Sequence, residues 1–96
     1  MEDTFMVPQH LHQILQQASK SIKEAQETAF EAQGSNEEML DQAVQLLLQG
    51  EQELEYARMQ AGTEATENPQ FQQAYEQLHD TRQQLQEAQQ NNNDVL

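Results

Sequence analysis

The stretch LLLQGEQELEYA, residues 46–57, has helical periodicity throughout and yet carries Gly50 near its centre. Leu47 and Leu54 recur at intervals that place them on the same helix face as Gly50. Glycine in a helix interior costs about 1 kcal/mol relative to alanine. We therefore expect Gly50 to mark a place where a neighbouring helix comes too near for a side chain. The alternative is that Gly50 marks a kink or hinge.

The same periodicity continues outward from this stretch and defines three helical segments, at residues 8–33, 36–61 and 69–90. In each segment apolar residues recur at alternating spacings of three and four, as in the heptad repeat of a coiled coil. One heptad position is large and the other is mostly alanine, so these apolar seams are rich in small residues. The seam residues are Leu11, Leu15, Ala18, Ile22, Ala25, Ala29 and Ala32, then Leu40, Ala43, Leu47, Gly50, Leu54, Ala57 and Ala61, then Phe71, Ala74, Leu78, Thr81, Leu85 and Ala88.

Residues typical of helix ends begin the first segment and separate it from the second. Pro8 suits the first position of a helix, where its missing N–H is not needed. Gly34 suits the left-handed position that follows a helix, and Ser35 with Glu38 three residues later matches a capping box. A turn this short requires the two helices to fold back on each other in opposite directions.

The boundary between the second and third segments is longer and more polar. Gly62 is predicted to end the second helix, and residues 63–68 are predicted to form a loop. Asn68 is a suitable N-cap, and Pro69 follows it at the first helical position. The Asn-rich stretch at residues 91–94 is predicted to end the third helix.

These features predict an all-α fold, an antiparallel three-helix bundle with heptad-type, Ala-rich seams, in a single domain of residues 1–96. The end segments 1–7 and 91–96 are expected to be frayed. The alternative is a long helical hairpin that completes its core by dimerising, with the third helix exchanged or detached.

The short turn also predicts which small residues face each other. When the first helix folds back on the second, Ala18 lies level with Gly50, and Ala25 lies level with Ala43. We expect the two helices to pack more closely at these four residues than the usual separation of about 8–10 Å between helix axes.

The charge balance excludes several classes of partner. The chain has 96 residues, with 17 acidic and 4 basic side chains and a net charge of −13. Nucleic acids and anionic membranes are bound through clustered Lys and Arg, so neither is an expected partner. The aliphatic run at residues 46–48 is far shorter than the roughly 20 residues of a membrane span. With no cysteine and no signal-peptide pattern, the chain is expected to be cytoplasmic.

Two sequence patterns contain candidate metal ligands. Glu76 and His79 match the Glu-x-x-His motif of di-iron bundles, which also need a second copy and two further glutamates. The nearby seam residue Leu78 is expected to turn both of them outward. His10 and His12 could chelate a metal in a strand, but residues two apart diverge by about 200° on a helix. We therefore expect no metal site and no cofactor.

A run of carboxylates at Glu51, Glu53 and Glu55 is of a kind that could serve in acid–base catalysis. These residues are predicted to lie on a solvated acidic helix, with no apolar pocket to perturb their pKa values. The sequence also has no Ser-His-Asp grouping and no Gly-rich phosphate loop. An enzyme is therefore not expected.

Several large apolar residues lie outside the seams, among them Ile14, Met39 and Met59. Some of these must widen the core for the third helix, and the remainder would form a contact surface. The candidate protein-contact face consists of Phe30, Val44, Leu48 and Tyr56. The predicted function is a non-enzymatic, acidic helical module that binds a protein partner. The alternative is a self-associating structural protein, in which these residues form a homodimer interface.

Three stretches carry a family resemblance. They are LHQILQQASKSIKEAQ, then SNEEMLDQAVQLLLQGEQELE after the short turn, and FQQAYEQLHDTRQQLQEAQQ near the end. Through them most of the chain resembles a small, Gln- and Glu-rich cytosolic helical protein family of Bacillus-type bacteria. The resemblance implies a helical cytosolic protein, and it implies no activity for any residue.

Overall fold

In a computed structural model of the protein, the structure describes residues 8–32 and 36–94. These residues are all-helical, without a strand, and form four compactly packed helices. The helices are α1 (Pro8–Glu31), α2 (Glu37–Ala61), α3 (Thr63–Thr66) and α4 (Pro69–Asp94). None of these helices is long and apolar enough to cross a membrane.

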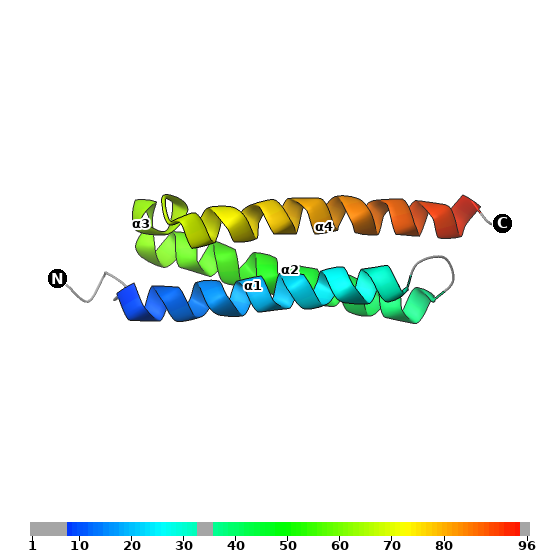
Figure 1. The fold of residues 1–96 in the computed structure, drawn as a ribbon, viewed down its shortest axis with the longest axis horizontal. Helices are drawn as coiled ribbons and strands as arrows, with labels where there is room; N and C mark the ends of the chain where they lie inside the picture. The colour runs from blue at the N-terminus through cyan, green and yellow to red at the C-terminus, as the bar shows by residue number, and fades with distance from the viewer. Residues whose placement is uncertain (1–7, 33–35, 95–96) are drawn as a thin grey trace.

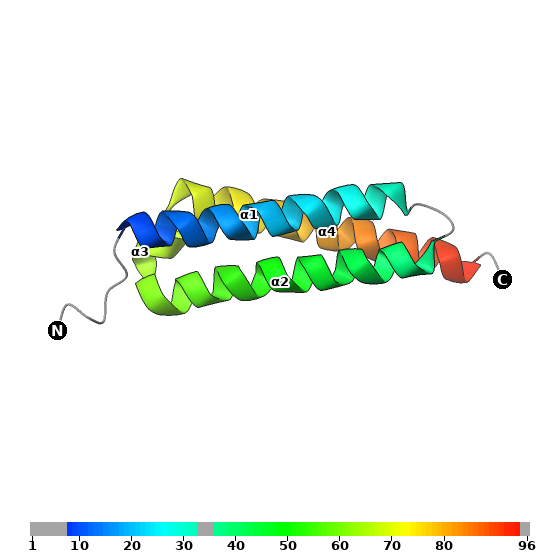
Figure 2. The same ribbon diagram turned by 90° about the horizontal axis from the view of Figure 1, so that it is seen from below.

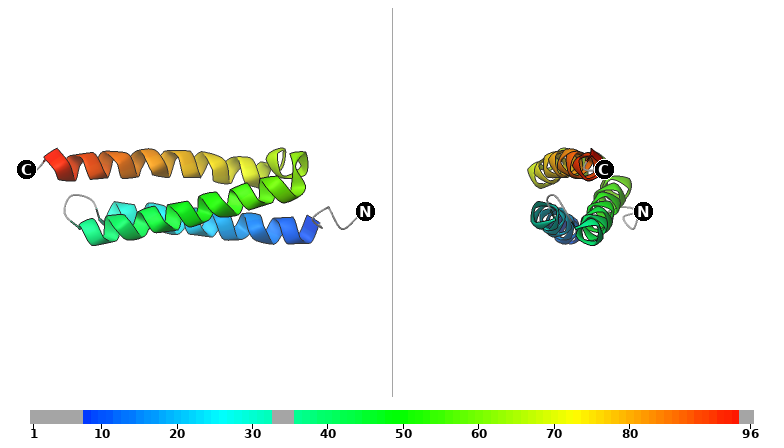
Figure 3. Two further views of the ribbon diagram at one scale, coloured as in Figure 1. Left: turned by 180° about the vertical axis from the view of Figure 1, so that it is seen from behind. Right: turned by 90° about the vertical axis from the view of Figure 1, so that its right-hand side faces the viewer.

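The three long helices lie side by side in a rod of 57 × 18 × 16 Å (Figure 1 and Figure 2). The chain reverses direction between α1 and α2, and again between α2 and α4, where the short helix α3 lies (Figure 1). The contact between α1 and α2 is the most extensive, and α4 packs against both (Figure 3). α1 and α2 therefore form a pair with α4 along one side.

The interior is lined by the residues that recur at spacings of three and four. Leu15 and Ile22 of α1 are fully buried, and Thr81 of α4 is a buried polar residue in the same interior. Burying this stripe removes apolar surface from water, which is the main force that holds the helices together. The buried apolar side chains are Leu11, Leu15, Ala18, Ile22, Ala25, Ala29, Ala32, Leu40, Ala43, Leu47, Leu54, Ala57, Ala65, Phe71, Ala74, Leu78, Leu85 and Ala88.

Gly50 is buried on α2 at a close approach to α1. A Cβ atom added at Gly50 would lie 2.6 Å from Ile22 Cγ1 and 3.3 Å from the backbone oxygen of Ala18. Ala18, Ala25 and Ala43 are fully buried. The nearest atom to Gly50, however, belongs to the large side chain of Ile22 rather than to a small residue. The space that Gly50 leaves is filled by a side chain of the other helix.

α2 begins one residue later than the capping box predicts. Its N-cap is Asn36, whose Oδ1 accepts a hydrogen bond from the backbone N–H of Met39 at 3.1 Å. The prediction of a cap formed by Ser35 with Glu38 is therefore wrong for this helix start. Asparagine is at least as good an N-cap as serine, because its short side chain reaches the same free N–H groups. Gly34 and Ser35 themselves lie outside the described residues.

The predicted loop at residues 63–68 is wrong in its first part, because Thr63–Thr66 form the helix α3. Gly62 ends α2 with φ of 59°, a conformation that favours glycine, and its N–H donates to the Arg58 oxygen at 2.9 Å. The Gly62 oxygen then accepts from the Thr66 N–H at 3.1 Å and so starts the next turn. Ala65 is the fully buried residue of α3. Periodicity needs several apolar residues at regular spacing, so this single alanine could not predict the helix.

α4 extends further than predicted. Asn68 caps its start, with Oδ1 accepting from the Gln70 N–H at 2.8 Å. The expectation that residues 91–94 end the helix is wrong, since they continue it. Asparagine is a weak helix former, but each residue added to an existing helix gains one hydrogen bond without a new nucleation step. The expected frayed ends at 1–7 and 95–96 lie outside the described residues.

Candidate functional site

Large apolar side chains remain on the surface although the interior is already filled. Within residues 8–32 and 36–94, the exposed ones are Phe30, Leu48, Tyr56, Met59 and Tyr75. Their exposure ranges from 47% for Leu48 to 72% for Met59. Scattered apolar residues are normal on protein surfaces, so the positions of these side chains decide whether any of them form a site.

The four residues of the predicted contact face do not form one continuous surface. Val44 is partly buried and packs against the core, so it helps to widen the interior. Phe30 lines a shallow groove beside Gln84 of α4, near the end of α1. Tyr56 lies near the start of α1, in a groove between α1 and α2. Leu48 is exposed one helical turn after Val44 on α2.

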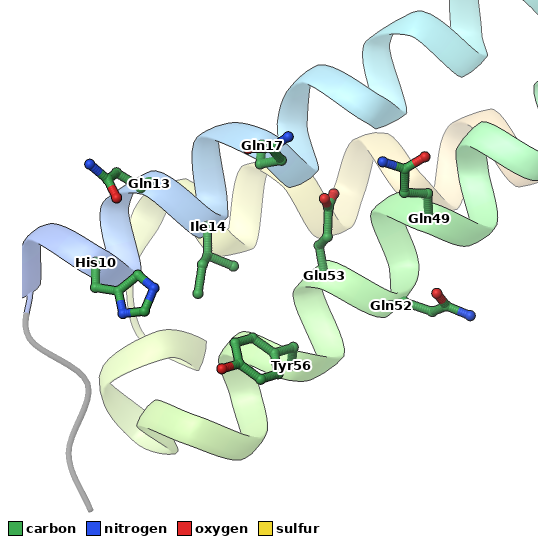
Figure 4. A pocket seen from close by; sticks show the side chains of 8 residues that line it. All are labelled: His10, Gln13, Ile14, Gln17, Gln49, Gln52, Glu53 and Tyr56. Atoms are coloured by element: carbon green, nitrogen blue, oxygen red, sulfur yellow. The ribbon is translucent and has the colours of Figure 1, made fainter. Parts of the chain in front are cut away.

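The groove that contains Tyr56 has a volume of about 490 Å³. We call it the α1–α2 groove, and it is lined by His10, Gln13, Ile14 and Gln17 of α1 and by Gln49, Gln52, Glu53 and Tyr56 of α2. Figure 4 shows the Ile14 side chain pointing toward Tyr56, with the His10 ring beside them. The Glu53 carboxylate points toward α1, and α4 passes behind the two helices. The groove therefore opens on the face of the α1–α2 pair that α4 does not cover.

Helical spacing explains why these side chains converge. His10, Ile14 and Gln17 are four and three residues apart, so they form one row beside the buried stripe of α1. Glu53 and Tyr56 form the corresponding row on α2. The two helices run in opposite directions and are in close contact, which brings the two rows together.

The pKa of Glu53, a carboxylate that lines the groove, is shifted from its ordinary value. The buried hydroxyl of Ser21 on α1 donates a hydrogen bond to its Oε1 at 3.2 Å. Burial raises the pKa of the Glu53 carboxyl above its ordinary value of 4.5, and hydrogen bonds from Ser21 and Gln49 offset part of this rise. The expectation that no pocket perturbs these carboxylates is therefore wrong for Glu53.

The other two glutamates of the run are paired with arginine. Arg58 bonds to both carboxylate oxygens of Glu55 one turn away and lowers the pKa of that carboxyl. Glu51 Oε2 lies 2.6 Å from Arg82 Nη2 and links α2 to α4 across the surface. Glu53 differs from both because it faces α1 and has a serine as its partner.

Glu53→Gln should raise the melting temperature at pH 7. A raised pKa means that the folded protein binds the Glu53 proton more tightly than the unfolded chain does, so ionisation opposes folding. This penalty is absent below about pH 4.5 and present once the pH exceeds the folded-state pKa. Glutamine stays neutral and keeps an acceptor for Ser21. Thermal melts between pH 3 and pH 8 should therefore show a gain that fades as the pH falls.

Glu55→Gln is the matched control for this pH series, because its pKa shift has the opposite sign. The Glu55 carboxyl has a lowered pKa, so its ionised form favours folding and its loss should lower the melting temperature at pH 7. An equal shift in both variants would point to net charge alone, and would contradict the role of burial at Glu53.

The two pairs of candidate metal ligands lie on different helices, and Glu76 and His79 line one groove of α4 together with Tyr75 and Asp80. Glu76 and His79 are exposed on α4. His10 lines the α1–α2 groove, whereas His12 Nδ1 lies 2.9 Å from Gln70 Oε1 of α4. In the described part of the chain, no three His, Asp or Glu side chains come together in a way that could hold a metal ion.

Two features of the surface were not predicted. Tyr75 is exposed on α4 and stacks on Phe71 with ring centroids 6.0 Å apart. Its position directly after the seam residue Ala74 could have indicated this exposure. The pairing of Ser21 with Glu53 spans 32 residues and depends on how α1 and α2 align. No local pattern could have revealed it.

The comparisons with known proteins leave the geometry as the only basis for a functional argument. No protein-family model matches the chain, and searches of curated proteins and of solved structures find no significant match. The resemblance to a helical family of Bacillus-type bacteria stays a prediction.

Proposed function

We propose that this chain is a non-enzymatic, acidic interaction module, an antiparallel three-helix bundle with Ala-rich heptad seams that binds another protein in the cytoplasm. One observation carries the proposal. Large apolar side chains, among them Leu48, Tyr56 and Met59, stay exposed beside an interior that the chain's own residues already fill. These side chains are not needed to complete the core.

Energetics support this proposal. Full burial of a side chain of this size is worth about 1.5–3 kcal/mol. A few such residues, aromatic ones above all, supply most of the binding energy of a typical protein interface. Tyr56 and Phe30 are aromatic and more than 45% exposed, at 49% and 66%. Each could therefore contribute to binding without loss of core packing.

Self-association is the second candidate, and one observation favours it. Leu48 and Met59 are eleven residues apart, which is close to three helical turns, so both lie on the same outer face of α2. A second copy could cover this face. Repulsion opposes such a dimer, because each copy carries a net charge of −13.

Light scattering over a hundredfold range of concentration distinguishes the two candidates. A partner-binding module should remain a monomer throughout, at 11.1 kDa. A photo-crosslinking residue in place of Tyr56 should then capture a specific protein in cell extract, whereas the same residue in place of the exposed Gln83 on α4 should capture little. A dimer that dissociates on dilution would contradict the proposal in favour of self-association.

A further inference from the structure

We infer that the α1–α2 groove binds lysine or arginine side chains of a basic amphipathic segment of a partner protein. The inference rests on the proposed function and names the chemistry that its partner must have. It depends on three features of the structure: an apolar wall, an oriented carboxylate and the charge of the surroundings.

The groove combines an apolar wall with a carboxylate. Ile14 and Tyr56 face each other across it, and Tyr56 is 49% exposed. Glu53 lines the same groove, and the Ser21 hydroxyl donates a hydrogen bond to one oxygen of the Glu53 carboxylate. A lysine or arginine side chain has a hydrocarbon stem and a charged head, so the stem would cover Ile14 while the head reaches Glu53. The Tyr56 ring adds a surface on which a cation is attracted.

The chain itself does not supply the cation in this groove. None of the described residues that line it is Lys or Arg. Arg58 and Arg82 are paired with Glu55 and Glu51 of the same chain, away from the lining. The remaining polar side chains of the groove are mainly glutamine amides, which can accept hydrogen bonds from an ammonium or guanidinium group. The missing positive charge would therefore come from the ligand.

Charge complementarity favours a basic protein segment over a second copy of this chain. With 17 acidic and 4 basic residues, a second copy would bring more negative charge than positive to the groove. A basic segment is attracted at long range by the same net charge. The groove lies between two helices that lie side by side, and a helix with apolar residues at helical spacing is the common occupant of such a groove.

The test uses the full chain labelled with ¹⁵N and a synthetic helical peptide with leucines at helical spacing and lysines beside them. Amide shifts on titration should concentrate at residues 10–17 and 49–56. Glu53→Gln should weaken binding roughly tenfold, since the variant keeps an acceptor but loses the charge that strengthens a hydrogen bond to the cation. Asp41→Asn removes one exposed charge from the same helix, and it should change the affinity less than about twofold.

Two further titrations test the parts of the groove. A peptide with norleucine in place of lysine keeps the stems and lacks the charges, and it should bind much more weakly. Tyr56→Leu keeps the wall apolar but removes the ring, and it should cost part of the affinity for the lysine peptide. The amide spectrum of each variant without peptide shows whether it is folded.

Several results would overturn the inference. Equal losses for Glu53→Gln and Asp41→Asn would show attraction by net charge only. Undiminished binding of the norleucine peptide would show an apolar groove without cation recognition. Shifts centred on Leu48 and Met59 would place the partner site elsewhere on α2. Each of these results leaves the proposed module intact if the chain is a monomer, whereas dimerisation at low concentration contradicts the proposed function itself.

Discussion

Leu15→Ala should lower the free energy of unfolding by about 2–5 kcal/mol. Leu15 is fully buried on α1. Its removal loses the transfer free energy of the side chain and leaves a cavity. Many of the buried side chains in this core are alanines, which have no flexible atoms to fill that cavity. Urea unfolding followed by circular dichroism at 222 nm measures the change, and the dependence on urea should keep its slope if folding stays cooperative.

Leu48→Ala is the matched control, since it makes the same chemical change at a side chain that is 47% exposed. We expect it to cost less than about 1 kcal/mol. A loss as large as that of Leu15→Ala would mean that Leu48 is buried in solution. That result would favour a dimer in which the outer face of α2 is covered.

Gly50→Leu should also be strongly destabilising, by about 3 kcal/mol. Even the first added carbon would lie 2.6 Å from Ile22 Cγ1, and the backbone oxygen of Ala18 closes the space from another side. Ile22 is β-branched and therefore stiff in a helix, so its Cγ1 atom has little freedom to move away. α1 and α2, the pair of helices with the most extensive contact, would have to separate at Gly50. Urea unfolding of the variant and of the parent chain measures the loss.

Gly50→Ala in two backgrounds shows whether Ile22 causes this cost. Alanine favours the helix by about 1 kcal/mol over glycine, but in the parent chain the contact with Ile22 should outweigh that gain. In an Ile22→Ala background the contact is gone, and Gly50→Ala should cost less or become stabilising. If Gly50→Ala already stabilises the parent chain, Ile22 lies farther from Gly50 than the 2.6 Å contact requires.

The contact residues were only partly predictable, and Val44 and Tyr56 show why. Both lie outside the seam of α2, and the sequence assigned both to one contact face. Val44 packs against the core, whereas Tyr56 is exposed in the α1–α2 groove. The difference depends on where the neighbouring helices lie around α2. Periodicity within one helix carries no information about that position.

Helicity and the buried side of each long helix were predictable from the amino-acid sequence alone. Both are local properties, because a spacing of three and four residues places apolar side chains on one face wherever the helix packs. Gly62 and Asn68 also predicted helix ends correctly, because these ends are formed by hydrogen bonds between residues close in the sequence. The helix α3 was not predictable, since its one buried residue, Ala65, cannot produce a periodic pattern.

The location of the candidate site, in contrast, depends on how the helices pack against one another. Burial between α1 and α2 raises the pKa of Glu53, and a hydrogen bond from Ser21, 32 residues away, offsets part of this rise. The α1–α2 groove forms because the alignment of the two helices brings the row of Ile14 on α1 beside the row of Tyr56 on α2. At this register the Ile22 side chain packs against Gly50. Contacts of this kind form between distant segments, so their geometry follows from packing rather than from local spacing.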